Sequence, residues 1–430
     1  MTISEPSKAL AGMTRAVLLA GGLVFVGCSS AHDSAVGIED LTTHSSLDPT
    51  FGNKGQATAD GLASAAAGGM TRRADGALVV VSVDRGTIDE DVPKANRDET
   101  SVTLAQFRHD GAVDTAFGPG GSRTFTRSRF VPHEVIVTKG GGIVVAGNAI
   151  VGTKDAKTYR PEVMRFTKAG EAEPSHQVVP LALEASKTPL TFRIFARPAG
   201  GFDVAAAVPK APAGVDGRAY VESFDDQGNP APRALAVPSP SQHVKGVGQS
   251  LDGRLFYMAV ELVTYSGGQQ VWAPAFWSLE GPSTTKLTDL PDELNMSVKR
   301  IDTEPNGDVI VTARLEKGVG KGASGGIAAY VVPAGRPSEA AFVALNRVSS
   351  YVVHTDASHR ILVSATLVDG AGTSLSVTRY QPNGAFDWTF TPAKVNETKI
   401  AAVDALVDDQ RLLVLASDEG RQRVWAFKQR

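Results

Sequence analysis

The chain repeats one pattern of apolar and polar positions seven times after residue 70. The second and fourth residues after each turn position are apolar in every copy, and the sixth is small. Because residues two apart point to one face of a β-strand, the pattern predicts one strand per copy with a fixed inward face. Intervening positions are often apolar too, which indicates that both faces are covered. The turn positions are Gly76, Gly141, Gly200, Gly253, Gly307, His359 and Gln410.

A second predicted strand in each copy ends at an aromatic residue or an apolar substitute. Most of these residues precede a glycine by four positions, as Phe107 precedes Gly111. The strand-ending residues are Phe107, Phe166, Phe224, Trp277, Val331, Tyr380 and Phe427. Their spacing runs from 59 residues down to 47, or about 55 per copy, which leaves room for four short strands in each unit.

A third element follows the glycine in some copies. Gly111 leads to the run VDTAFG at residues 113–118, and similar runs stand at residues 47–52 and 386–390. Together, these elements resemble the delta-60 repeat of bacterial surface and secreted proteins, with its L-D-x-x-F-G, D-G-x-I-V-V-A-G and R-[FY]-x-x-D-G segments. The match is good over residues 47–170 and 375–391 and degenerate between about 171 and 340. The resemblance implies a repeat fold and carries no activity with it.

These observations predict an all-β fold, a seven-bladed β-propeller over residues 47–430. A first unit that opens at Leu47 and a last unit that ends at Arg430 give seven whole units. Circular closure would hide the strand edges that an open sheet exposes, and an open β-solenoid is the alternative. No segment of 10 residues after the leader shows the 3.6-residue period of an amphipathic helix.

The N-terminal 46 residues predict the localisation of the protein. Lys8 and Arg15 precede an apolar run of 11 residues at 16–26, the pattern of a secretory signal peptide, whereas a membrane-spanning helix needs about 20 apolar residues. Residues 25–28 (FVGC) resemble a bacterial lipobox. That resemblance implies a signal peptide at residues 1–27 and acylation of Cys28, the one cysteine of the chain. Residues 28–46 are expected to form a flexible polar tether.

By the same resemblance, Ser29 after the cysteine favours the outer membrane of the cell envelope over the inner membrane. The lipid anchor would be the only contact with a membrane, and the protein is expected to be a monomer. The chain carries 43 basic and 46 acidic residues, a net charge of −3, which provides no field to attract nucleic acid.

Candidate chemistry is sparse in the sequence. The eight histidines show no metal-ligand spacing such as HxH or HxxxH, and we expect no cofactor and no catalytic residue. Asp89, Glu90 and Asp91 lie in an acidic run between two strands of the first unit. Calcium takes oxygen ligands from such loops, but without DxDxDG spacing a solvated loop is the simpler interpretation.

The sequence favours a non-catalytic binding or scaffold module for a protein or glycan. We expect the partner to meet the face that carries the loops between the two predicted strands, because equivalent loops of a repeat fold emerge together. These loops are 83–100, 148–159, 208–217, 261–270, 316–326, 368–374 and 417–421. The alternative is a propeller enzyme, of lyase or dehydrogenase type, acting on an extracellular carbohydrate, since fold does not separate the two. A structural spacer is a third hypothesis.

Lipidation at Cys28 is directly testable. Cys28→Ala should abolish labelling of the chain by a palmitate analogue and leave the precursor uncleaved, because the thioether that carries the lipid cannot form. The matched control is Ser29→Ala, which keeps the thiol. Labelling that persisted in the Cys28→Ala variant would rule out this anchor.

Overall fold

The structure is a computed structural model, and it confirms an all-β propeller. It describes residues 47–59, 61–62, 68–83, 100–127, 129–152, 156–173, 178–179, 181, 183–187, 190, 192–208, 218–231, 242–251, 253, 256–266, 269–280, 283–289, 298–317, 324–346, 348–369, 372–387, 393–395, 400–408, 411–418 and 421–428. For residues 256–289 the description is of the backbone. The proposed signal peptide, Cys28 and the tether lie outside these residues.

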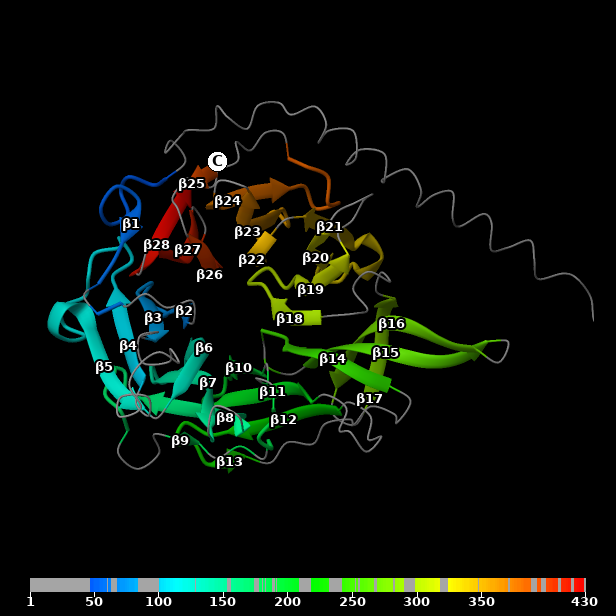
Figure 1. Ribbon diagram of the computed structural model, residues 1–430, viewed down its shortest axis with the longest axis horizontal. Helices are drawn as coiled ribbons and strands as arrows, with labels where there is room; N and C mark the ends of the chain where they lie inside the picture. The colour runs from blue at the N-terminus through cyan, green and yellow to red at the C-terminus, as the bar shows by residue number, and fades with distance from the viewer. Residues whose placement is uncertain are drawn as a thin grey trace, which may run out of the picture. The chain divides into compact units, whose positions relative to one another are not determined.

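The described strands form seven four-stranded antiparallel sheets, which we call blades 1 to 7 (Figure 1). Blade 1 holds β2 (Gly68–Arg72), β3 (Leu78–Val83), β4 (Thr100–Phe107) and β5 (Ser122–Arg127), and blade 2 holds β6 (Phe130–Val137), β7 (Ile143–Val151), β8 (Thr158–Phe166) and β9 (Val178–Val179). Blade 3 holds β10 (Phe192–Ala196), β11 (Phe202–Val208), β12 (Arg218–Phe224) and β13 (Pro230–Ala231), and blade 4 holds β14 (Gln242–Gln249), β15 (Phe256–Ser266), β16 (Gln269–Glu280) and β17 (Ser283–Asp289). Blade 5 holds β18 (Val298–Thr303), β19 (Val309–Lys317), β20 (Ser324–Val332) and β21 (Ala341–Asn346), and blade 6 holds β22 (Val348–Thr355), β23 (Ile361–Asp369), β24 (Gly372–Tyr380) and β25 (Ala393–Val395). Blade 7 holds β26 (Ala401–Val407), β27 (Arg411–Asp418), β28 (Arg421–Lys428) and β1 (Gln56–Ala57). Two short 3₁₀ turns, Pro119–Gly121 and Pro337–Glu339, precede β5 and β21. None of the described helices is long and apolar enough to cross a membrane.

The first strand of each blade lies innermost (Figure 1), and at six of the seven junctions it contacts the first strand of the next blade. At the junction of blades 5 and 6, β22 contacts mainly β19 and β20. β2 contacts both β6 and β26, so the ring of inner strands is closed between blades 7 and 1. A hydrogen bond from the Met70 backbone N–H to the Asp404 Oδ2, 2.8 Å long, crosses this junction. The open solenoid is therefore excluded.

The predicted apolar strand is the second strand of each blade, and both of its faces are buried. In β3, Leu78 and Val80 pack against blade 7, whereas Val79, Val81 and Val83 pack against blade 2. The core thus consists of layers between blades, which confirms the expectation that both faces of this strand are covered. The sixth position after the turn is small because space is short: a Cβ on Gly147 would lie 2.4 Å from the Phe130 ring.

The acidic residue of the L-D-x-x-F-G element ties the third strand of a blade to its outer edge. Gln106 donates to Asp114 over 2.5 Å, and Arg379 donates to Asp387 over 2.7 Å. Arg165 makes the same contact with Glu173, 2.8 Å apart. Glu173 therefore continues the element in blade 2, where the sequence pattern had faded.

In two copies of the same element, the aromatic residue packs on a glycine of the next blade, in the turn that follows the third strand. Phe117 lies against Gly170, where an added Cβ would be 2.3 Å from the ring. Phe51 lies against Gly111, whose φ of +79° also favours glycine, and the Gly52 N–H donates to the Asp110 carbonyl over 2.7 Å. Each of these elements thus fastens one blade to the following one.

The expectation that the first unit opens at Leu47 was wrong. Leu47 forms a bridge with Phe427, equivalent to the bridges Phe107–Val113 and Tyr380–Phe386 within blades 1 and 6. Asp48 lies near Lys428 and Arg411, at 3.8 and 4.0 Å. Residues 47–57 therefore complete blade 7, because its own fourth strand has to come from the other end of the chain (Figure 1, where blue β1 lies beside red β28).

Two strand-ending positions and several predicted loops also differ from expectation. Val332, rather than Val331, pairs with Val309, and Trp277 pairs with Met258 in a shifted register. Residues 261–270 are largely strand: β15 and β16 stay paired up to Ser266 and Gln269, so this hairpin extends well beyond the others (Figure 1). Strand length varies among the blades together with loop length, because paired backbone continues into the insertions.

Closure of the ring predicts that the stability of the fold depends strongly on Phe51, which is fully buried. Phe51→Ala should lower the free energy of unfolding by about 3–5 kcal/mol, because it removes the ring that joins blade 7 to blade 1. Denaturant unfolding followed by tryptophan fluorescence measures the change, and Lys54→Ala in the same segment is the matched control. A loss no larger than that of the control would contradict this role of residues 47–57.

Candidate functional site

Charged side chains from four inner strands occur at one level of the ring. Glu134, Arg193, Arg300 and Asp404 each pair with the fifth residue after the turn position of their own blade, which is respectively Ala146, Ala205, Thr312 and Leu415. Because the inner strands surround the propeller axis, equal register places these groups around the axis at equal height. We call these four residues, with Asp302, the axial charge cluster.

Blades 2 and 3 are joined by one complete ion pair of this cluster. Nε and Nη2 of Arg193 both lie 2.7 Å from Oε1 of Glu134. The other carboxylate oxygen, Oε2, accepts the backbone N–H of Ile194 over 2.8 Å. Both oxygens of Glu134 are thus engaged, as buried carboxylates require.

Arg193 and Arg300 each also reach a carboxylate two blades further along the ring. Arg193 Nη1 lies 2.9 Å from Asp302 Oδ1, which links blade 3 to blade 5. Arg300 Nε lies 2.7 Å from both oxygens of Asp302, and its Nη1 lies 3.8 Å from Asp404 Oδ1 in blade 7. Asp404 in turn accepts the N–H of Met70 in blade 1. The contacts of these charged side chains therefore link five blades (1, 2, 3, 5 and 7) at the axis.

This arrangement shifts several pKa values. Burial alone would raise the pKa of Asp302, but the guanidinium groups of Arg193 and Arg300 outweigh it and hold the pKa at about 2. Burial raises the pKa of Asp404, which is partly offset by Arg300 and the Met70 N–H. Although burial opposes it, the pKa of Arg300 is raised because Asp302 and Asp404 stabilise its charge. The two arginines stay charged, as the pairing requires.

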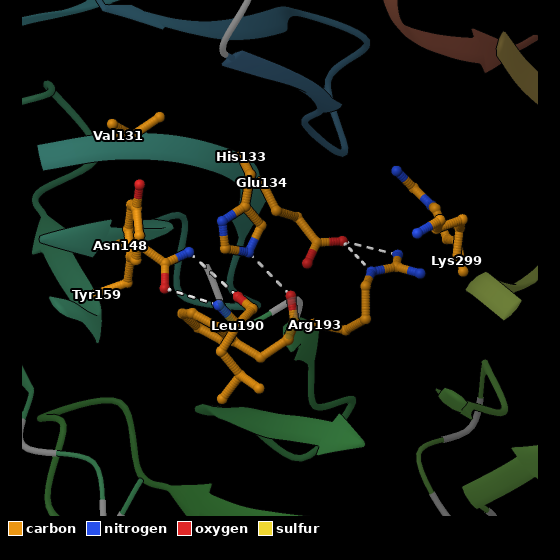
Figure 2. A pocket seen from close by; sticks show the side chains of 10 residues that line it. Val131, His133, Glu134, Asn148, Tyr159, Leu190, Arg193 and Lys299 are labelled. Carbon is orange, nitrogen blue, oxygen red and sulfur yellow. Dashed lines mark hydrogen bonds and ion pairs between the residues drawn. The ribbon is translucent and has the colours of Figure 1, made fainter. Parts of the chain in front are cut away.

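A cavity of about 310 Å³ opens beside this cluster, between blades 2, 3 and 5 (Figure 2). Its wall is apolar on one side and charged on the other. The lining residues are Val131, His133, Glu134, Asn148, Tyr159, Leu190, Phe192, Arg193, Lys299 and Arg300. Asn148 lies near the end of the second strand of blade 2. The other lining residues lie at or near the start of a first or third strand of blades 2, 3 and 5. The cavity therefore belongs to the face on which loops between second and third strands emerge.

His133 is oriented by its neighbours. Its Nε2 lies 2.9 Å from the carbonyl oxygen of Phe192, and the two rings meet edge to face with centroids 4.8 Å apart. Because a carbonyl only accepts, Nε2 carries the proton and Nδ1 keeps a lone pair in the neutral ring. Burial lowers the pKa of His133, although Glu134 opposes this, so the ring is neutral at pH 7.

Asn148 and Leu190 fix the far wall of the cavity. The Asn148 side chain donates to the Leu190 carbonyl over 3.1 Å and accepts the Leu190 N–H over 3.3 Å. Tyr159 is held through its backbone, which exchanges hydrogen bonds of 2.7 and 2.9 Å with Ser186. In Figure 2, the pair formed by Glu134 and Arg193 lies between His133 and Lys299. The cavity thus has a preformed shape.

A second histidine lies close to the axis on blade 6. His354 Nδ1 is 3.0 and 3.1 Å from the two carboxylate oxygens of Glu304, and the side chain is buried. Burial alone would lower the pKa of His354, but Glu304, Asp302 and Asp404 outweigh it and raise the pKa. Among the described residues, no group pairs with its buried Nε2.

The structure does not place the candidate residues from the sequence. Cys28, Asp89, Glu90 and Asp91 fall outside the described residues, within which no cluster of metal-ligating side chains occurs. His359 takes a turn position with φ of +61° and lies 2.8 Å from Asp308. The axial charge cluster and His133 were not predicted. A signal was present, because Glu134, Arg193, Arg300 and Asp404 share one position relative to the turns, but the recurring apolar pattern lies in the second and third strands and not in the first.

Comparisons with known proteins identify no family. No family model matches the chain, and no curated protein matches it. An ulvan lyase of polysaccharide lyase family PL25, bound to -[GlcA(1-4)Rha3S]-, is 12% identical with a TM-score of 0.47, over 87% of this chain and 94% of that one. The polysaccharide lyase Uly1 is 10% identical with a TM-score of 0.43, over 84% and 89%. The propeller domain of Myceliophteria thermophila Cps50 (Swd1) is 9% identical with a TM-score of 0.44, over 87% and 100%. At these values the likenesses carry no argument about function.

The fold and the cavity define the chain as a closed β-propeller with a charged axis and a preformed cavity on its loop face.

The two histidines near that axis predict opposite pH dependences of stability. The folded pKa of His354 lies above 6.5, so its stabilising effect is complete below that pH and is lost as the pH rises through the folded pKa. The folded pKa of His133, which faces Glu134, Arg193 and Arg300, lies below 6.5. Its contribution is therefore present above pH 6.5 and lost as the pH falls.

Denaturant unfolding between about pH 5.5 and 8.5 measures both effects. The stability difference between wild type and His354→Gln should shrink as the pH rises, whereas the difference for His133→Gln should shrink as it falls. Parallel responses of the two variants would contradict the assigned directions.

Proposed function

We propose that this chain is a lipid-anchored binding propeller of a bacterial cell envelope, and that its partner occupies the cavity on the loop face. The observation that carries the proposal is the position of the cavity. Asn148 and Tyr159, two of its lining residues, are the bounds of one of the loops expected to contact a partner. A preformed concave site with apolar walls and a few convergent polar groups is the usual form of a ligand site.

The state of the charged groups supports binding rather than chemistry. Glu134 is fully engaged by Arg193 and the Ile194 N–H, and Asp302 is shared by two arginines. A carboxylate held in this way, with the pKa of Asp302 at about 2, is a poor proton acceptor at neutral pH. The axial charges therefore serve to shape the cavity wall.

One observation favours a second candidate function, an enzyme that acts on an extracellular carbohydrate. The neutral His133 ring borders the cavity and keeps a lone pair on Nδ1, because Nε2–H is used by the Phe192 carbonyl. Such a nitrogen is suited to accept a proton from a bound substrate. The two candidates share the cavity and differ in whether the ligand leaves unchanged.

A glycan array probed with the full chain tests the binding function. Tyr159→Ala should weaken binding to any glycan found by about tenfold or more, because a partly exposed tyrosine at a site wall is a common energetic anchor. The control is Lys139→Ala, an exposed side chain on the β6–β7 turn, six residues along the strand from His133 and about 20 Å away. Binding that was lost in the control and kept in Tyr159→Ala would place the partner on the turn face and contradict the proposal.

Any ligand found in this way also distinguishes the enzymatic function from the binding function. After incubation with the full chain, mass spectrometry should recover the ligand intact if the protein only binds it. Conversion that disappears in His133→Gln, while binding is retained, would replace the binding function by the enzymatic one.

A further inference from the structure

We infer that the cavity accepts a small carboxylate-bearing ligand rich in hydroxyl groups, the chemistry of a sugar acid. This inference rests on the proposed binding function and narrows it to one class of ligand. It follows from the chemistry of three walls of the cavity: one is cationic, one is formed by His133 and one is apolar.

The cationic wall consists of Lys299 and Arg300 at the start of β18. Among the lining residues, Arg193, Lys299 and Arg300 are cationic and Glu134 is the one carboxylate. The carboxylates of Glu134 and Asp302, with Asp404 at 3.8 Å from Arg300, balance the charges of Arg193 and Arg300. Lys299 is exposed, and none of the described residues forms an ion pair with it. A single negative charge on the ligand would therefore meet an uncompensated ammonium.

The histidine wall requires a hydrogen-bond donor from the ligand. His133 Nδ1 has no hydrogen-bond partner among the described residues, and its lone pair cannot be satisfied by a carboxylate or a phosphate. A ligand hydroxyl can donate to Nδ1. Because the ring stays neutral at pH 7, it offers no second positive charge for a phosphate dianion. The pairing of one ammonium with one neutral acceptor favours a hydroxy acid over a phosphate ester.

The apolar wall supplies a surface for carbon–hydrogen groups. Val131 and Leu190 line the cavity on the side away from Lys299 (Figure 2), and Val131 is partly exposed. Sugars carry apolar C–H faces beside their hydroxyl groups, so one ring could cover this wall while its polar edge faces His133. The volume of about 310 Å³ is at the small end of ligand sites, which suits one or two sugar rings.

Isothermal titration of the full chain with D-galacturonate tests the inference, with its methyl ester and D-galactose as neutral counterparts. D-Galacturonate should bind saturably, about threefold more tightly than its methyl ester, because only the free acid carries the charge for Lys299 and an exposed ion pair contributes about that much. Lys299→Met should abolish that preference, and Lys299→Arg should restore it. Lys139→Met on the turn face should leave it unchanged.

His133→Phe tests the acceptor separately, because phenylalanine keeps an aromatic ring against Phe192 but has no nitrogen that could accept a hydrogen bond. This variant should weaken D-galacturonate and D-galactose alike, whereas Lys299→Met should affect the acid alone. Equal binding of acid and ester, or an acid preference insensitive to Lys299, would overturn the inference. If neutral glycans bind at the loop face and the acid does not, the sugar-acid inference fails while the binding function stands. If the array yields no ligand and D-galacturonate does not bind, both fail.

Discussion

The ion pairs at the axis are the constraint on which the ring depends. A propeller brings seven inner strands together around one line, and that line has to be filled with side chains or with water. Here Arg193 and Arg300 reach past neighbouring blades to Asp302 and Asp404. Charges buried in this way are costly unless each is matched, and the matching fixes the relative positions of blades 2, 3, 5, 7 and 1. The wall of the cavity is one side of the same network.

A second set of contacts acts at the rim. In the elements at residues 47–52 and 113–118, the acidic residue holds the outer edge of one blade and the aromatic residue lies on a glycine of the next blade, as Phe117 does on Gly170. The rim is therefore fastened by local, repeated contacts, whereas the axis is fastened by a few long-range ones. This difference explains why the rim has a recognisable sequence motif and the axis does not.

That contrast also explains what could be predicted. Alternating apolar residues in the second strands, with small residues such as Gly147, predicted an all-β propeller because these positions recur in every copy. The placement of Leu47 was wrong, because a motif that looks alike at both ends of a unit cannot say which blade it completes. The axial charge cluster was missed because each blade contributes a different residue at the shared position: Glu134, Arg193, Arg300 or Asp404. Only the ring geometry, which brings distant strands together, turns these isolated charges into pairs.

The completion of blade 7 by the N-terminal segment has a consequence for the time course of folding. Gln56 and Arg423, which are hydrogen-bonded, are 367 residues apart in the chain, so the ring cannot close until the last strand has been synthesised. Until then, residues 47–57 have no partner strand, and blade 7 lacks its edge. Contacts of such long range form slowly. A chain built in this way stays open-ended throughout its synthesis, and its last strand decides when the ring can close.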